Sequence, residues 1–168
     1  MSDDLIEYFK KGGKMLGIYT GTELGQPSPT INRDSAGLRA WSYFAHSKNV
    51  DFLAIYMLDC FYKNQNNTRA PGAYERSGSG QLLFGGMKNG EGSAEVPLYY
   101  GIRFEAVRDS LEDYEYIYRV SQFSSQEATD LLNRVAHLFP TNAEVPHDLH
   151  DLLKLKADMA QFLDEQYE

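Results

Sequence analysis

Short apolar runs alternate with amphipathic segments over the first third of the chain. The spacing predicts a helix over residues 3–11, capped by Ser2 or Asp3 and ended by Gly12 and Gly13. Residues 14–19 and 50–57 are short apolar runs bounded by turn-forming residues, which is typical of buried strands. Residues 34–46 lie between them and carry apolar side chains at helical spacing. This order predicts parallel β/α units.

The pattern changes after the second apolar run. Residues 58–97 are polar and rich in glycine, with a small apolar island at residues 81–84. We expect a long loop over one side of the domain, with a hairpin around the apolar island, because loops of this length in compact domains usually carry function. The glycines follow neither the G-x-G-x-x-G pattern nor a phosphate-binding loop ending in G-K-[ST]. Dinucleotide binding is therefore not expected.

The rest of the chain predicts three helices. Residues 99–120 form the most regular segment, and its apolar positions predict one inward side. These positions are Phe104, Val107, Leu111, Tyr114 and Tyr118. Ser124 and Glu127 match a capping box that opens a helix to about residue 139, and a last helix is expected over residues 147–166. We interpret residues 1–120 as a partial barrel and residues 121–168 as a helical tail.

Composition narrows the classes of function. With 168 residues the chain suits one domain, and it is too short for a complete (β/α)8 barrel of roughly 200–250 residues. The net charge of −8 and the scattered basic residues argue against nucleic-acid binding. No apolar run is long enough to span a membrane, and no secretory signal is visible, so a cytoplasmic location is the default expectation.

Metal and cofactor chemistry find little support in the sequence. The lone Cys60 excludes an internal disulfide framework and a cysteine-based zinc site. His147 and His150 have acidic neighbours, but the start of a solvated helix explains that arrangement better than a metal site does. We expect no metal and no cofactor. The 12 tyrosines are the unusual feature, because a ring with a hydroxyl suits sugars as well as protein partners.

One segment resembles a known family. Residues 101–117, GIRFEAVRDSLEDYEYI, are similar to a segment near the C-terminus of glycoside hydrolase family 123 and its relatives, a region catalogued as domain of unknown function 4091. Weaker likenesses occur in the same order at residues 14–19, 39–41, 50–56 and 79–85. The resemblance implies an α/β fold that forms the C-terminal part of a (β/α)8-type barrel. Residues 14–19 and 50–56 would be late barrel strands, and the long loop would lie near the sugar-binding end.

The region that resembles the family does not include the family's catalytic residues. Family 123 enzymes hydrolyse β-linked N-acetylgalactosamine through an adjacent Asp-Glu pair on an earlier strand, upstream of the matched region. The Asp-Glu dipeptide of this chain, Asp164–Glu165, lies outside the match. The chain also departs from the family pattern at Tyr56, where Trp is preferred, at residues 84–86, and at Ser110, where the family has glycine.

Candidate site residues cluster at the ends of the two predicted strands. Glu23 and Asp59 are weak catalytic candidates, because two carboxylates flanking a glycosidic bond are the minimal machinery of most glycosidases. Sugar-stacking or loop-anchoring roles are equally open for the aromatic residues there. The substrate-binding candidates are Tyr19, Tyr56, Asp59, Phe61, Tyr62 and Tyr74.

A second polar cluster lies on the predicted helix over residues 99–120. It could contact sugar, but an ion-pair network that holds the helix in place is the favoured interpretation. Its members are Arg103, Glu105, Arg108, Asp109, Glu112 and Asp113.

The sequence thus predicts a non-catalytic, barrel-closing portion of a family 123-like carbohydrate-active protein that contributes to glycan binding. The alternative is an assembly subunit that uses a truncated barrel for protein contacts, and a stand-alone glycosidase is less favoured. Two parallel strands leave an edge and an apolar side uncovered. We therefore expect a homo-oligomer, or a partner chain that supplies the missing strands.

Overall fold

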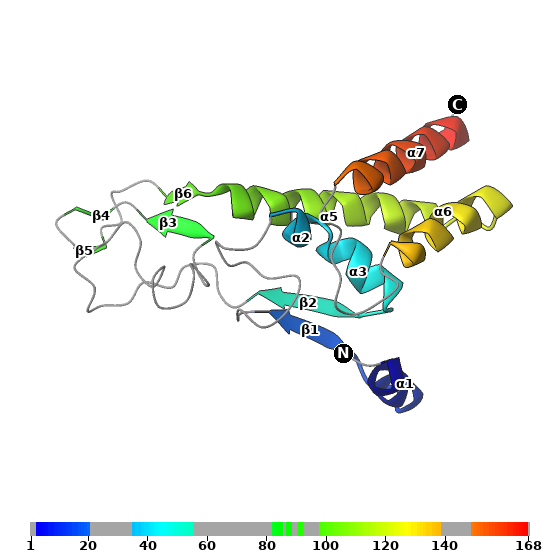
Figure 1. Cartoon of the computed structure of the whole chain (residues 1–168), viewed down its shortest axis with the longest axis horizontal. Helices are drawn as coiled ribbons and strands as arrows, with labels where there is room; N and C mark the ends of the chain where they lie inside the picture. The colour runs from blue at the N-terminus through cyan, green and yellow to red at the C-terminus, as the bar shows by residue number, and fades with distance from the viewer. Residues whose placement is uncertain are drawn as a thin grey trace.

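The computed structural model describes residues 3–20, 35–55, 82–85, 87–88, 91–92, 98–138 and 149–167. Helices predominate, and three pairs of strands accompany them (Figure 1). The helices are α1 (Asp3–Lys11), α2 (Ser35–Arg39), α3 (Trp41–Ser47), α5 (Ile102–Val120), α6 (Gln126–His137) and α7 (His150–Tyr167). The strands are β1 (Gly17–Thr20), β2 (Phe52–Ile55), β3 (Leu83–Gly85), β4 (Met87–Lys88), β5 (Glu91–Gly92) and β6 (Leu98–Tyr100).

The predicted parallel pair of strands is confirmed. β1 and β2 pair in parallel, with Gly17 opposite Phe52 and Thr20 opposite Ile55. The ring of Phe52 lies where a side chain on Gly17 would stand, so a larger residue at this position would require that ring to move. Because α2 and α3 connect the two strands, residues 17–55 form one parallel β/α unit.

Asp51 fixes the start of β2 against the end of α1. Its Oδ2 accepts a hydrogen bond from the Leu16 backbone N–H at 2.6 Å, and its Oδ1 lies 2.9 Å from Lys10 Nζ. The Leu16 hydrogen bond, together with Lys10, lowers the pKa of the Asp51 carboxyl. Gly13, with a φ of +63°, turns the chain after α1 as expected of a glycine that ends a helix.

Several expected boundaries were wrong. Ala40 divides the helix expected over residues 34–46 into α2 and α3. The helix expected from residue 99 begins only at Ile102, because residues 98–100 form β6, which pairs antiparallel with β3. Ser125, not Ser124, caps α6, and its Oγ accepts from the Ala128 N–H at 3.1 Å. The late start of α5 has a cause that the local pattern does not contain, namely the pairing of β6 with β3.

The core lies among the helices. α5 packs against α2, α3, α6 and α7, and in Figure 1 α2 and α3 lie between α5 and the β1–β2 sheet. Partly buried Ile18, Leu53 and Ile55 pack against this core from the sheet. Its buried members include Trp41, Tyr43, Phe44, Ile117, Val120, Leu131, Val135, Leu152, Leu155, Met159 and Phe162.

The expected orientation of α5 was also wrong. The buried side of the helix, called here the inner side, consists of Ala106, Ser110, Asp113, Ile117 and Val120. The predicted inward residues Phe104, Val107, Leu111, Tyr114 and Tyr118 form a different strip, called here the outer stripe. Phe104 and Val107 are half-buried, whereas Leu111, Tyr114 and Tyr118 are 64%, 42% and 51% exposed. Partners far away in the sequence, and not local apolarity, decide which side of α5 is covered.

The described part of the chain is a partial α/β arrangement in which the strands pair two by two. It does not contain a closed barrel. None of the helices in the described ranges is long and apolar enough to cross a membrane.

Candidate functional site

The candidate sugar-binding residues follow the two parallel strands. Tyr19 is in β1, where its backbone pairs with Ala54 of β2. The other candidates, Glu23, Tyr56, Asp59, Phe61, Tyr62 and Tyr74, lie outside the described residues. The strands themselves end level with each other, because Thr20 and Ile55 are opposite in register. The carboxyl ends of β1 and β2 therefore lie at one edge of the sheet.

That edge is the carboxyl end of a parallel sheet. Ligands of parallel α/β folds bind at this end, because the connecting segments converge there and can vary without disturbing the strands. The strand register is thus the described feature that agrees with the predicted position of a site. Among the described residues there is no cluster of His, Cys, Asp or Glu that could hold a metal ion.

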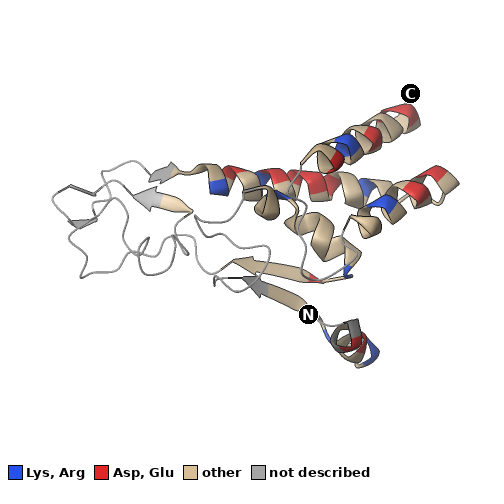
Figure 2. Ribbon diagram, viewed as in Figure 1, with Lys and Arg blue, Asp and Glu red and all other residues tan. Residues whose placement is uncertain are grey.

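A charged network lies inside the helical part. Arg39, at the end of α2, donates to both oxygens of Asp113, with Nε at 2.9 Å from Oδ2 and Nη2 at 3.2 Å from Oδ1. Its Nη1 also donates to Asp109 Oδ2 at 3.2 Å. Lys156 of α7 brings a second cation to within 2.6 Å of Asp113 Oδ1, and its ammonium lies 5.2 Å from the centre of the Tyr116 ring. The network thus joins α2 and α7 to α5, and Figure 2 shows charges of both signs along α5 and α7.

The charged side chains of this network are largely buried, and burial affects the pKa values of Arg39 and of its neighbour Tyr43. The Asp113 side chain is 1% exposed, while those of Arg39 and Lys156 are 15% and 23% exposed. Burial alone lowers the pKa of Arg39, but its hydrogen bond to Asp113 and the charges of Asp113 and Asp109 outweigh this and raise it. Tyr43 of α3 is fully buried nearby, and burial followed by the negative charge of Asp113 raises the pKa of its hydroxyl. Arg39 therefore stays charged and Tyr43 stays neutral at neutral pH.

Ser110 provides a second polar contact on the inner side of α5. Its Oγ accepts from the backbone N–H of Ser42 at 3.0 Å and lies 3.0 Å from the Ser42 Oγ. The Ser42 N–H belongs to the first turn of α3, and the residue that precedes this helix, Ala40, supplies no side-chain cap. Ser110 therefore satisfies a buried donor that α3 leaves unpaired. The glycine that the family pattern has at this position could not do so.

The remaining members of the polar cluster pair along α5 itself. Arg108 lies 2.5 Å from Glu105 and 3.5 Å from Glu112, and its side chain is 56% exposed. Arg103 is partly buried, and burial lowers its pKa. These contacts support the structural interpretation of the cluster: Asp109 and Asp113 hold helices together, and Glu105, Arg108 and Glu112 form surface pairs.

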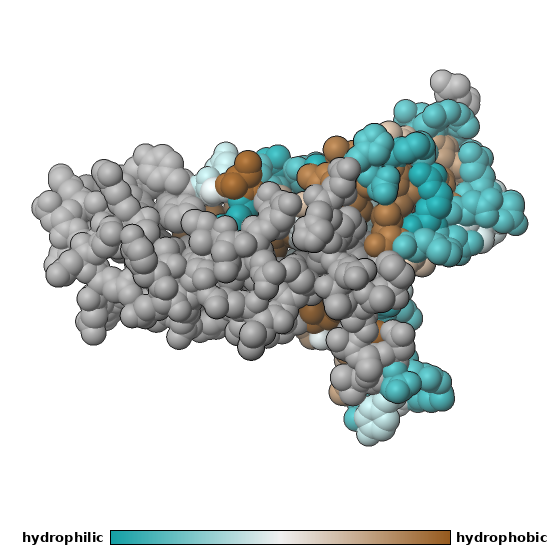
Figure 3. Space-filling view, viewed as in Figure 1, coloured by the Kyte–Doolittle hydropathy of each residue, from teal (hydrophilic) through white to brown (hydrophobic). Residues whose placement is uncertain are grey.

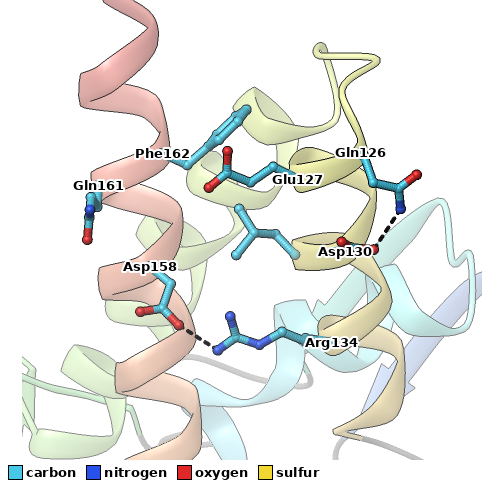
Figure 4. Close-up of a pocket in the computed structure, with 8 residues that line it drawn as sticks. Gln126, Glu127, Asp130, Arg134, Asp158, Gln161 and Phe162 are labelled. Atoms are coloured by element: carbon cyan, nitrogen blue, oxygen red, sulfur yellow. Dashed lines mark hydrogen bonds and ion pairs between the residues drawn. The ribbon is translucent and has the colours of Figure 1, made fainter.

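Sequence reasoning did not identify a groove between α6 and α7. It has a volume of about 560 Å³ and is lined by Gln126, Glu127, Asp130, Leu131, Arg134, Asp158, Gln161 and Phe162 (Figure 4). Arg134 reaches across it to Asp158 at 2.6 Å, and Gln126 bonds Asp130 at 2.9 Å on its rim. The apolar floor residues Leu131 and Phe162 are buried in the core. Most of its polar groups are thus paired within the protein, so the groove is an ordinary contact surface between two packed helices.

Comparison with known proteins identifies the fold of the chain. The chain matches a family 123 glycoside hydrolase from Clostridium perfringens with a TM-score of 0.70 and 16% sequence identity. The match covers 98% of this chain but 30% of that one. No protein-family profile matches the sequence, and no curated protein matches it. The chain therefore shares the fold of a part of that enzyme and spans about a third of its length.

Proposed function

We propose that the chain is the non-catalytic, barrel-closing portion of a family 123-like carbohydrate-active protein and that it contributes to glycan binding. The observation that carries this proposal is the structural match, which extends over nearly the whole chain. The matched enzyme is described as hydrolysing the glycans of glycolipids. The sequence resemblance at residues 101–117 points to the same family independently of the structure.

The position proposed for the glycan is the carboxyl end of β1 and β2. Thr20 and Ile55 end level with each other, so the segments that follow them can contact one ligand. Tyrosine and phenylalanine rings in these segments would stack on the apolar side of a sugar ring, and Asp59 would accept hydrogen bonds from its hydroxyls. The candidates are Tyr19, Tyr56, Asp59, Phe61, Tyr62 and Tyr74.

The non-catalytic part of the proposal rests on the sequence. The adjacent Asp-Glu pair of the family belongs to an earlier strand than those matched here, and Asp164–Glu165 lies in α7. A stand-alone glycosidase would need Glu23 and Asp59 to act as the carboxylate pair.

Binding to a glycan array, followed by titration with a β-linked N-acetylgalactosaminide, tests the proposal. We expect Tyr56→Ala and Asp59→Asn each to weaken binding about tenfold, which corresponds to about 1.4 kcal/mol. Tyr8→Ala is the matched control, because Tyr8 lies in α1 and is 67% exposed. Absence of glycan binding by the folded chain would refute the proposal. Turnover of a chromogenic substrate that disappears in Glu23→Gln or Asp59→Asn would instead establish the glycosidase.

The assembly subunit is the second candidate function. The observation that favours it is the exposure of the outer stripe on α5, since a contiguous apolar surface marks an interaction site. A stable complex with another protein, together with no glycan binding, would favour this role.

A further inference from the structure

Two aromatic rings meet where β6 passes into α5. The ring centres of Tyr100, the last residue of β6, and Phe104, in the first turn of α5, lie 5.8 Å apart, and the ring planes are tilted by 40°. Tyr100 is 62% exposed and Phe104 is half-buried, so the pair, called here the aromatic platform, is open to solvent on its Tyr100 side. Figure 3 shows hydrophobic side chains exposed among hydrophilic ones at this end of α5.

The backbone holds the platform in a fixed place. Tyr100 is opposite Leu83 in the antiparallel pair of β6 with β3. The Gly101 N–H donates to the carbonyl of the fully buried Leu82 at 3.2 Å, and the Phe104 N–H donates to the Gly101 carbonyl at 2.9 Å. One ring is thus attached to a paired strand and the other to the first turn of a helix. A binding surface held in this way loses little conformational freedom when a ligand settles on it.

The direction of α5 brings the platform to the end of the molecule where the proposed glycan site lies. β1 and β2 run in one direction and α5 runs in the opposite direction, so the amino-terminal end of α5 and the carboxyl ends of the two strands lie toward the same end of the molecule (Figure 1). In folds built from parallel β/α units, ligands bind at the carboxyl ends of the strands. Tyr100 and Phe104 therefore lie toward the ligand-binding end, whereas Tyr114 and Tyr118 lie further along α5, away from it.

The size and chemistry of the platform suit a sugar ring. A pyranose ring has C–H groups on its faces and hydroxyls around its rim, and tyrosine offers an apolar ring face to the first and a hydroxyl to the second. An aromatic side chain buries about 150–250 Å², so two rings provide the contact area of a small ligand. This area falls well short of the roughly 800 Å² per partner of a stable protein interface. The platform by itself therefore favours a sugar over a protein partner.

We infer that the aromatic platform is a subsite for the glycan, in which one sugar ring stacks on Tyr100 while Phe104 holds that tyrosine in place. The inference rests on the proposed glycan binding and extends it. It adds a contact from β6 and α5 to those proposed for the segments that follow β1 and β2, and it assigns a binding role to Tyr100, which the sequence did not indicate.

Calorimetric titration of the full chain with a tetrasaccharide that ends in β-linked N-acetylgalactosamine tests the subsite. Tyr100→Ala removes the exposed ring, and Tyr100→Phe keeps the ring but removes its hydroxyl. Ile102→Ala is the matched control, because Ile102 is a neighbouring apolar residue that is 78% exposed and has no aromatic ring. Circular dichroism of each variant checks that its helix content is unchanged, as expected for substitutions at exposed positions.

We expect Tyr100→Ala to weaken binding about tenfold and Tyr100→Phe to weaken it only about twofold, since the stacking ring is retained. Ile102→Ala should bind as the wild type does. Wild-type affinity in Tyr100→Ala would overturn the subsite and leave the proposed function standing, and so would an equal loss in Ile102→Ala. No binding by the wild-type chain would instead refute the proposed function, and the subsite with it.

Discussion

The inner side of α5 has polar groups among its buried residues, whereas the outer stripe has apolar side chains that are exposed. The inner side includes the polar Ser110 and the charged Asp113, and both are buried. The outer stripe consists of aliphatic and aromatic side chains, and three of its five members are largely exposed. Arg39, Lys156 and Ser42 explain the first half of the contrast, because they supply each buried polar group with partners. Burial along this helix therefore follows the available partners, and the described residues leave much of the outer stripe open to solvent.

The largest expected effect comes from removing the charge at the centre of the inner side. Asp113→Ala removes the carboxylate that pairs with Lys156 and leaves Arg39 with Asp109 alone, which is expected to lower the free energy of unfolding by about 3–5 kcal/mol. Urea denaturation measures this directly. Asp109→Ala is the matched control, since Asp109 is 32% exposed and its loss should cost about 1 kcal/mol or less. Equal losses for the two variants would show that Asp113 is not the centre of the network.

A matched truncation on each side of α5 gives the next largest difference. Ile117→Ala on the inner side removes a fully buried side chain and should lower the free energy of unfolding by about 3 kcal/mol. Leu111→Ala on the outer stripe should change it by no more than about 0.5 kcal/mol in the isolated chain. A comparable cost for Leu111→Ala would mean that the stripe is already covered, which contradicts the contrast between the two sides.

The contact between α3 and α5 should have an intermediate effect. Ser110→Ala leaves the buried Ser42 N–H without its acceptor, at an expected cost of about 1–3 kcal/mol. Ser110→Gly should cost about 1 kcal/mol more, because glycine is unfavourable in a helix interior. Thermal or urea unfolding of both variants checks the order. A Gly variant as stable as the wild type would show that Ser110 does not cap α3.

The smallest expected effect is a pH dependence of stability. It originates from His46 of α3, the helix that covers the inner side of α5. Burial lowers the pKa of His46 below its usual value of 6.5, so the unfolded chain binds a proton there more readily than the folded chain does. Stability should therefore fall as the pH drops below about 6.5, and His46→Gln should weaken this dependence. His137→Gln, at an exposed position on α6, is the control. An unchanged pH profile in His46→Gln would exclude this residue as the cause.

The spacing of apolar residues and glycines predicted much of the fold, because these elements depend on residues close together in the sequence. The glycines after Lys11 ended α1 as expected, and two short apolar runs became β1 and β2, paired in parallel. The orientation of α5 could not be predicted in this way. Its apolar spacing favoured the outer stripe, and the residue that draws the other side inward, Arg39, is 74 positions away from Asp113 in the sequence. Pairing of β6 with β3 is likewise non-local, which explains why residues 98–100 were expected to be helical.

The candidate site, too, could be predicted only in part from the sequence. The sequence predicts a site after the ends of two adjacent parallel strands, and the structure shows those ends level with each other at Thr20 and Ile55; binding of a ligand there stays a prediction. The roles of Glu23, Tyr56, Asp59, Phe61, Tyr62 and Tyr74 stay predictions, because these residues lie outside the described part of the chain. The sequence favoured an ion-pair network for the polar cluster of α5, but the distant partners Arg39 and Lys156 could be identified only from the structure.

Tyrosine labelling tests the contrast between the two sides of α5 most directly. A tyrosine-selective reagent is applied to the isolated chain and to the protein in the cells that make it, and Tyr8 of α1, which is 67% exposed, serves as the internal reference. In the isolated chain, Tyr114 and Tyr118 should react together with Tyr8, because they are 42% and 51% exposed. In the cell, their labelling relative to Tyr8 should fall strongly, since the outer stripe is then covered. Equal relative labelling in both settings would contradict the account, because it would show that the stripe is an ordinary solvent-facing surface.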